Sequence, residues 1–252
     1  MIECGSLEYA QARLQARHGL RASEAAWQRL ETAREFPALL DAAARSPLRP
    51  WLAGITAGSP AHRIEAVLRA HWRACVAEVA GWMPPAWRPA LAWCAVLPDL
   101  PLLQHLARGG ATAPWMQDDP AYRALFTAAS GHRADALAEG PFAPLAPAWS
   151  APETLARAWR AEWQRRLPPA RGDSLGPVVQ ALQRHGAAFG GAPAGTGWLM
   201  RRALQARLQL LMRRAALEPA TAFIHLALCA LDVERLRAEL LGRVLFARPR
   251  LP

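Results

Sequence analysis

The sequence contains no lysine and no asparagine, so all 30 of its basic residues are arginines. Without lysine, the chain cannot supply the amine of a P-loop, of a protein-kinase ATP site or of a pyridoxal-phosphate Schiff base. A glycine-rich stretch at 190–197 lacks a Gly-Lys-Ser/Thr sequence and has no strand before it. We therefore interpret that stretch as a linker rather than as a phosphate-binding loop.

Cysteine is also scarce, with four residues and no C-x-x-C spacing. Cys75, Cys94 and Cys229 lie within apolar runs, where cysteine usually behaves as a small hydrophobic residue. No apolar segment typical of a signal peptide is visible near the N-terminus. We therefore expect a protein of the reducing cytoplasm.

Long hydrophobic runs are absent as well. The longest, at 222–231, includes His225, and the longer stretch at 90–106 is interrupted by Pro98, Asp99 and Pro101. A membrane-spanning helix needs about 20 consecutive apolar residues. The sequence therefore predicts a soluble protein.

What the chain does contain is enough apolar material for a core. Its 252 residues are 52% hydrophobic, which fits one large domain or two modest ones and excludes a mainly disordered chain. The formal net charge of +10 is compatible with an acidic protein, an anionic membrane surface or nucleic acid as the partner. It is equally compatible with a coding preference for arginine, because the charge is spread along the chain.

Apolar residues recur at helical spacing, and no strand alternation is found. The predicted fold class is all-α, with about ten helices in pseudo-repeated lobes. The expected helices cover residues 7–17, 23–30, 35–45, 60–81, 86–97, 152–167, 177–189, 198–217, 219–231 and 232–243. Ser23 and Ser59 are the expected N-caps of the second and fourth of these helices, and Leu199 is expected to face a core from the helix at 198–217. A proline-rich segment at 140–151 suggests a linker between N-terminal lobes at 1–139 and a C-terminal lobe at 152–252.

Catalytic constellations are not evident. Asp118 and Asp119 precede Pro120, which is more simply explained as a helix start than as a paired-carboxylate site. His225 lies in an apolar helix, where a core histidine is the simpler interpretation. We predict no catalytic, metal-binding or cofactor-binding residues and no cofactor. An enzyme would require His71, His105 or His225 to converge with Asp99 or Asp232 in a pocket.

Two segments, 97–109 and 230–242, look like one element written twice. Each has an aspartate four residues before a leucine, Asp99 and Leu103 in the first and Asp232 and Leu236 in the second, and each ends on glycine. A helix that ends, turns on an aspartate N-cap and restarts would produce this pattern. The repetition predicts a pseudo-symmetric helical scaffold.

The opening segment resembles a known family. Tyr9 is followed by an Ala-Arg pair ending at Arg13, by a second arginine at Arg17 and by a turn at Gly19. This is similar to the N-terminal helix of the V-type ATPase C/d family, whose members are the C-type central-stalk component of the bacterial and archaeal enzymes and the d-type component of the eukaryotic enzyme.

The segment 90–109 resembles a helix pair of that family with Asp-x-x-Asn-Leu at its joint. Asp99 and Leu103 occupy the outer positions of that motif, and Leu102 replaces the asparagine.

The closing segment resembles the family's acidic-x-x-Asn-Leu-Arg sequence. Asp232, Leu236 and Arg237 match, Arg235 replaces the asparagine, and residues 246–249 follow as in the family's tail. The long helix at 198–217, the following Glu-Pro pair and the apolar helix also appear in the family's order. The resemblance covers about half of the chain, which is shorter than the usual family member.

The resemblance implies a non-catalytic, all-helical body that sits on the membrane proteolipid ring and receives the central rotor stalk. Such a body would couple ATP hydrolysis or synthesis to ion translocation, in the cytoplasm and peripheral to the inner or plasma membrane. Arginines bind carboxylates and phosphates in bidentate geometry, which suits such contacts. The predicted partner-binding residues are Arg13, Arg17, Arg201, Arg202, Arg213 and Arg214.

Three alternatives stay open. The arginines could be solvated or paired with glutamates four residues away, and the chain could be a soluble helical adaptor or regulator outside the ATPase. A basic all-α nucleic-acid binder is the third, because Arg157 and Arg160 flank Trp159.

Overall fold

A computed structural model describes residues 5–169, 174–193 and 195–246 of the chain. Helices make up 75% of the structure, which contains twelve α-helices and, within those ranges, no strand. The predicted all-α fold class is therefore confirmed. Cys4 and the tail positions 247–249 lie outside the described residues.

The chain divides into two compact units. Unit 1 combines Met1–Leu91 with Pro169–Pro252, and unit 2 is Ala92–Pro168. This division differs from the predicted lobes at 1–139 and 152–252. The proline-rich segment is not a linker, because it folds inside unit 2 as the 3₁₀-helix η6 (Ala143–Ala148), which packs against neighbouring helices. Pro144 is tolerated near the start of η6, because the first backbone N–H groups of a helix have no partner within the helix.

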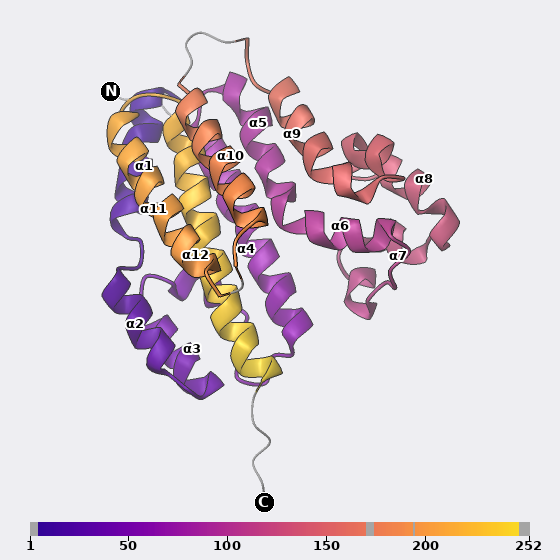
Figure 1. Cartoon of the computed structure of the whole chain (residues 1–252), viewed down its shortest axis with the longest axis horizontal. Helices are drawn as coiled ribbons and strands as arrows, with labels where there is room; N and C mark the ends of the chain where they lie inside the picture. Colours follow the sequence, from indigo (N-terminus) through magenta and orange to yellow (C-terminus); the bar gives the residue numbers. More distant parts are fainter. Residues whose placement is uncertain (1–4, 170–173, 194, 247–252) are drawn as a thin grey trace, which may run out of the picture. The chain divides into compact units, whose positions relative to one another are not determined.

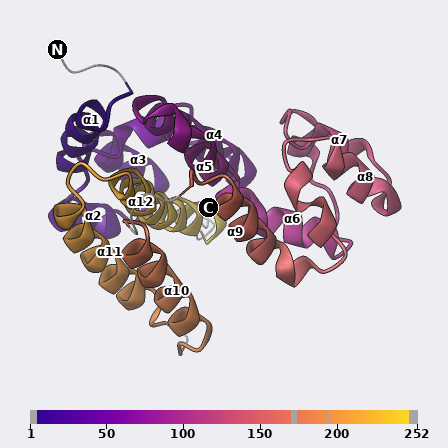
Figure 2. The ribbon, with the colours of Figure 1, turned by 90° about the horizontal axis from the view of Figure 1, so that it is seen from above.

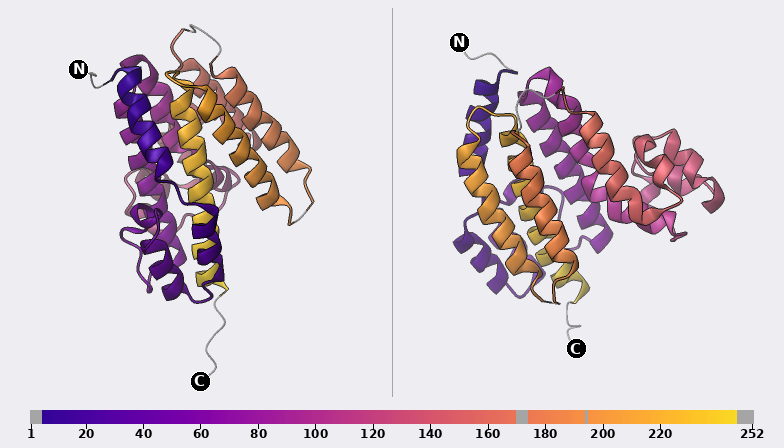
Figure 3. Two further views of the ribbon diagram at one scale, coloured as in Figure 1. Left: turned by 90° about the vertical axis from the view of Figure 1, so that its left-hand side faces the viewer. Right: turned by 45° about the horizontal axis from the view of Figure 1, so that its top comes forward.

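Unit 1 is a helical bundle with α12 at its centre. α12 contacts α4 and α1 on one side and α11 on the other, with α10 packed against α11 (Figures 1 and 2). Figure 3 shows α10, α11 and α12 side by side. The elements of unit 1 are α1 (Leu7–Gly19), α2 (Glu24–Thr32), α3 (Phe36–Ala44), η1 (Arg49–Leu52), α4 (Ala61–Trp82), η2 (Pro85–Trp87), the first part of α5 (Arg88–Trp93), α10 (Gly176–Gly190), α11 (Gly197–Arg214) and α12 (Ala220–Leu245).

Most helix boundaries follow their local signals. The Ser23 hydroxyl accepts a hydrogen bond from the Ala26 amide and caps α2, as predicted. For α4, the predicted Ser59 cap is wrong: Pro60 occupies the N-cap position, and the Ser59 hydroxyl accepts from the Thr56 amide instead. The glycine-rich stretch joins α10 to α11, as expected of a linker.

The prediction of a second helix joint at Asp232 is wrong. α12 runs without interruption through Asp232 and Gly242, so no joint exists there. The first copy does contain a break, because Asp99 stands between a 3₁₀-helix and α6, and Gly109 follows α6 with a φ of 83° that favours glycine. Pro98 and Pro101 explain the difference, since no proline lies near Asp232.

The far end of unit 1 has a continuous apolar core. α2, α3, η1 and the start of α4 pack around the C-terminal half of α12. Leu236 and Leu240 of α12 are completely buried there. The fully or largely buried side chains of this cluster are Trp27, Leu30, Phe36, Leu39, Ala43, Leu48, Leu52, Ile64, Leu68, Leu236, Leu240 and Leu241.

Unit 2 is made of short helices. They are the end of α5, η3 (Cys94–Asp99), α6 (Leu100–Ala107), η4 (Pro114–Gln117), α7 (Arg123–Thr127), η5 (Ser130–His132), α8 (Arg133–Ala138), η6, η7 (Pro152–Thr154) and α9 (Leu155–Arg165). Its core includes Leu103, Met116 and Tyr122, all fully buried. The Arg133 guanidinium closes the loop after α6 by donating to the Gly110 carbonyl at 2.8 Å.

Candidate functional site

A cavity of about 650 Å³ lies within unit 1, between the end of α1, the segment 47–51, α4 and α12. One helical face of α4, which includes His71, Cys75 and Glu78, lines the cavity. On α12 the lining residues are His225, Cys229 and Asp232, which share one face because they are spaced by four and three positions. The aromatic rings of Trp51 and Trp82 form part of the cavity wall. A cavity with apolar walls and a few polar groups is the usual form of a binding site.

A buried ion pair joins α12 to the loop after α1. The Arg21 guanidinium donates Nε to one Asp232 oxygen at 2.7 Å and Nη2 to the other at 2.8 Å. The two side chains are only 9% and 8% exposed. Burial raises the pKa of Asp232, and the Arg21 charge opposes that rise. Asp232 is therefore committed to Arg21 and is a poor candidate for a general base.

Two cysteines and a histidine meet at the cavity wall. The Cys229 thiol of α12 hydrogen-bonds the Cys75 sulfur of α4, and the His225 Nε2 lies 3.5 Å from the Cys229 sulfur. Burial, followed by the charges of Arg21, His18 and Arg17, lowers the pKa of His225 to about 4. His225 is thus neutral at pH 7, and its buried Nδ1 has no hydrogen-bond partner among the residues that the structure describes.

One of the predicted partner-binding arginines, Arg17, lines the cavity, and a second, Arg13, lies over Trp82 of the cavity wall. Arg17 donates to Glu78 at 2.5 Å, and the guanidinium carbons of Arg13 and Arg17 lie 5.2 and 6.0 Å from the Trp82 ring centroid. These are cation–π contacts. Arg17 therefore helps to hold α1 on α4, a role that the sequence alone did not indicate.

The arginines of α11 divide into paired and exposed ones. Arg201 bonds Glu234 of α12 and lies over the Phe189 ring at 4.4 Å, and Arg202 lies 3.3 Å from Glu24. Arg213 and Arg214 are exposed, and no ion pair involves them within the described ranges. Arg201 and Arg202 thus pair with glutamates that are distant in the sequence, not with glutamates four residues away as the alternative supposed.

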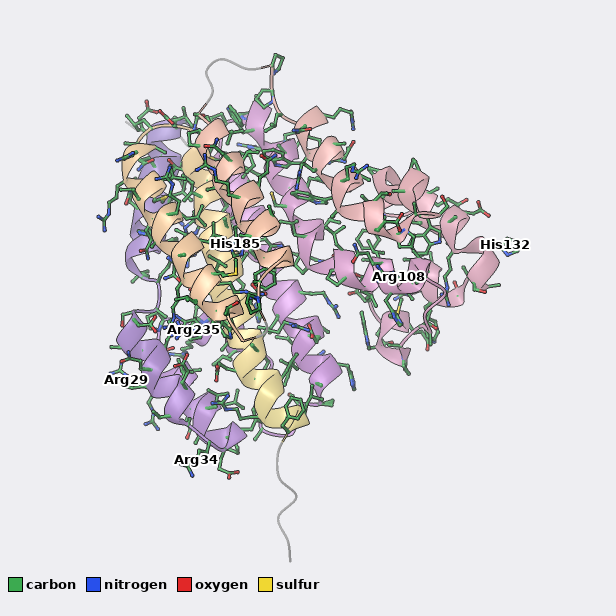
Figure 4. The ribbon with its side chains drawn as sticks, viewed as in Figure 1. Arg29, Arg34, Arg108, His132, His185 and Arg235 are labelled. Atoms are coloured by element: carbon green, nitrogen blue, oxygen red, sulfur yellow. The ribbon has the colours of Figure 1, made fainter. Side chains whose placement is uncertain are left out.

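The remaining predicted residues are structural. Leu103 and Leu236 are completely buried, and Asp99 is buried, belongs to unit 2 and is not among the residues that line the cavity. Arg237 donates to Glu65 of α4. Arg235, labelled in Figure 4, bonds Glu24 and Glu31 of α2 and lies over Trp27, although the resemblance had treated it only as a replaced asparagine.

The hairpin of α10 and α11 exposes large apolar side chains. Leu199, which the sequence predicted to face the core, is 70% exposed, and Trp198 and Phe189 are also exposed. Partial burial and then the Arg201 charge lower the pKa of His185, which lies on α10 (Figure 4). We call this surface the hairpin face and define it as Leu182, Phe189, Trp198, Leu199 and Leu210 with the neighbouring exposed Arg207, Arg213 and Arg214.

The enzyme alternative required histidines and an aspartate in one pocket, and the cavity does bring together His71, His225 and Asp232. Their contacts argue against acid–base chemistry by these groups and against a nucleophilic Cys229 paired with His225. The His71 Nε2 lies 2.9 Å from the Ala53 carbonyl, and the pKa of Cys229 is raised by its bond to Cys75 and by burial. A cysteine protease needs the opposite, a thiolate stabilised by an imidazolium.

The nucleic-acid alternative depended on Trp159. Its indole Nε1 donates to the Trp93 carbonyl at 3.2 Å, and Trp93 returns the bond to the Trp159 carbonyl at 3.0 Å. Trp159 also stacks on Trp163 with an interplanar angle of 12°. The ring is engaged in unit 2, which leaves less of it available for base stacking.

Among the residues described, no group of three or more His, Cys, Asp or Glu is placed to hold a metal ion. One stretch, Pro85–Ala107, is long and apolar enough to cross a membrane, with a mean hydropathy of 1.2, and 44% of its apolar segment is buried in the structure. The core helices of soluble proteins can have the same length and composition, and this stretch is broken into η2, α5, η3 and α6.

No protein-family model matches the chain, and neither a curated protein nor a solved structure matches it.

Proposed function

We propose that the chain is a non-catalytic helical subunit that works by contacting partner proteins through the hairpin face. The assembly that we propose is a V-type rotary ATPase, in which the chain would connect the central rotor stalk to the membrane proteolipid ring. The observation that carries the proposal is the exposed apolar and cationic surface of α10 and α11.

The composition of the hairpin face is that of a protein interface. Trp, Phe and Arg are enriched at interfaces, and a cluster of exposed apolar side chains marks an interaction site. Trp198 is 37% exposed and Phe189 38% exposed, next to the cation of Arg201. The exposed Arg207, Arg213 and Arg214 favour an acidic partner surface.

The ATPase assignment is supported by the N-terminal helix and by the helix order. Tyr9, Arg13 and Arg17 lie on α1, as the family's opening helix would have them. α11, the Glu218-Pro219 pair and the apolar α12 follow one another in the family's order. The joint expected at Asp232 is absent, which counts against a conventional member of that family.

A helical adaptor outside the ATPase is the second candidate. The continuous α12 favours it, because the continuous helix removes the joint on which part of the resemblance depended. Both candidates use the hairpin face, and they differ in the identity of the partner.

The test is affinity capture of the tagged chain from membrane extracts of its own cells, followed by mass spectrometry. The comparison variant is Arg213→Ala/Arg214→Ala, which removes the two exposed charges of the hairpin face. A matched control, Arg29→Ala/Arg34→Ala, removes two exposed charges from α2 and the turn after it (Figure 4).

We expect rotor-stalk and proteolipid-ring subunits with the unaltered chain and with the control, and a loss of about tenfold with the α11 variant. Tenfold corresponds to about 1.4 kcal/mol of binding free energy. Recovery of a different set of partners would support the adaptor. Recovery that is equal for both variants would contradict the role of the hairpin face.

A further inference from the structure

Cys75 and Cys229 approach each other from neighbouring helices. Cys75 lies on α4 and Cys229 on α12, the two helices at the centre of unit 1, and both thiols are free. Their side chains hydrogen-bond to each other and line the same cavity from these two packed helices. A disulfide requires the two cysteines to face each other at short range, and this placement on facing helices suits that requirement.

The pair is reachable from the cavity. Both cysteines line the 650 Å³ space, and Cys75 is the less buried of the two. Hydrogen peroxide is about the size of two water molecules, so it fits a cavity of this volume. Cys94 offers a contrast, because it lies outside the cavity and its burial raises its pKa to about 12.

The surroundings give the two sulfurs different roles. The hydrogen bond from Cys229, followed more weakly by the Arg17 charge, lowers the pKa of Cys75, against the opposing effects of burial and Glu78. The same hydrogen bond and burial raise the pKa of Cys229. A thiolate is the nucleophile in cysteine chemistry, and Cys75 is also the more exposed of the two side chains, so Cys75 is the attacking sulfur and Cys229 the resolving one.

We propose that Cys75 and Cys229 form a reversible disulfide site that is oxidised by hydrogen peroxide entering through the cavity. This site is independent of the partner contacts proposed for the hairpin face. Its formation would tie α4 covalently to α12 beside the Arg21–Asp232 ion pair.

The chemistry takes two balanced steps. The Cys75 thiolate attacks one peroxide oxygen, the O–O bond breaks, and hydroxide leaves and takes up the thiol proton to become water, which gives a sulfenic acid on Cys75. The Cys229 sulfur then attacks the Cys75 sulfur, the S–O bond breaks, and the hydroxide that leaves takes the Cys229 proton as water. Two thiols and one peroxide thus give one disulfide and two waters, and a thiol reductant reverses the reaction.

The test uses the full-length chain with Cys4→Ser, reduced and then treated with hydrogen peroxide. Free thiols are alkylated, and linked peptides are identified by mass spectrometry before and after reduction. We expect the free-thiol count to fall by two, with a Cys75–Cys229 peptide that disappears on reduction. Thiols that stay free at both positions, or irreversible oxidation of Cys75 without a linked peptide, would overturn the proposal.

Two variants assign the roles. Cys229→Ala should stop the reaction at the Cys75 sulfenic acid, which dimedone traps, and Cys94→Ser should leave the disulfide yield unchanged. Dimedone trapping of Cys229 but not Cys75 in the unaltered pair would contradict the proposed order of attack.

Discussion

At the scale of single residues, the Arg21–Asp232 pair is the most consequential polar contact of unit 1. Removing one partner leaves the other charge buried without compensation, which costs about 3–5 kcal/mol. We therefore expect Arg21→Met to lower the free energy of unfolding in urea by about that amount. The measurement is the urea midpoint at constant m-value.

The double variant Arg21→Met/Asp232→Leu is the control for this prediction. Replacing a buried pair by apolar residues of similar volume is often nearly neutral, so most of the lost stability should return. A double variant as unstable as the sum of the single ones would show that the two side chains do not act as a pair.

His225 predicts a dependence of stability on acidity. Its pKa is lowered from 6.5 to about 4 by burial and by the neighbouring Arg21, His18 and Arg17. Between these two values the unfolded chain binds more protons at this histidine than the folded chain does. The contribution of His225 to the free energy of unfolding is therefore complete above pH 6.5 and falls by about 3 kcal/mol as the pH drops to 4. Partial burial also lowers the pKa of His18, which adds a loss of the same sign.

Urea titrations at a series of pH values test this slope. His225→Leu should flatten the dependence between pH 6.5 and 4 while leaving the His18 contribution. A variant with the same slope as the original chain would exclude His225 as its source.

At the scale of helices, the continuity of α12 is the feature that most alters the sequence-based interpretation. If a joint existed at Asp232, Val233 would occupy the first helical position, where proline is well tolerated. In a continuous helix, the same proline removes a backbone hydrogen bond and clashes with the preceding turn. Val233→Pro should therefore lower the free energy of unfolding by about 3 kcal/mol or more.

Val233→Ala is the matched variant, because it keeps the backbone donor and truncates a side chain that is only partly buried. It should change stability much less than the proline variant. If the proline variant were as stable as the original chain, the result would contradict a continuous α12 and would support a joint at Asp232.

The sequence was most informative about local structure. Spacing and caps predicted the positions of α1, α2, α3, α4, α10 and α11, since these signals act within a few residues. The pattern at Asp232 led to a wrong prediction of a helix joint, because this aspartate pairs with Arg21, which precedes it by 211 residues, and does not cap a helix. A carboxylate four residues before a leucine looks the same whether it caps a helix or pairs with a distant arginine.

The candidate site could be predicted only in part. The face of α4 that carries His71, Cys75 and Glu78 has helical spacing in the sequence, as does the face of α12 that carries His225, Cys229 and Asp232. Nothing local indicated that these two faces meet. Their meeting depends on the packing of α4 against α12, which is a long-range property.

At the scale of the whole chain, unit 1 joins two segments that are far apart in the sequence. Ion pairs between them include Arg235 with Glu24 and Glu31, and Arg237 with Glu65. The positive charge that suggested a binding surface is thus partly used inside the unit. Part of what stays exposed, Arg207, Arg213 and Arg214, lies with apolar side chains on the hairpin face.

The central claim is that the hairpin face contacts a partner protein, and site-specific photo-crosslinking in living cells tests it most directly. Amine-reactive reagents are unsuited to a chain without lysine. A photoreactive amino acid placed at Leu199, with a control at the exposed Gln28 of α2, reports which protein lies against each surface. We expect an adduct with a rotor-stalk or proteolipid-ring subunit from position 199 and none from position 28. Adducts from position 28 alone, or no adduct from position 199 in a chain that is folded and abundant, would contradict it.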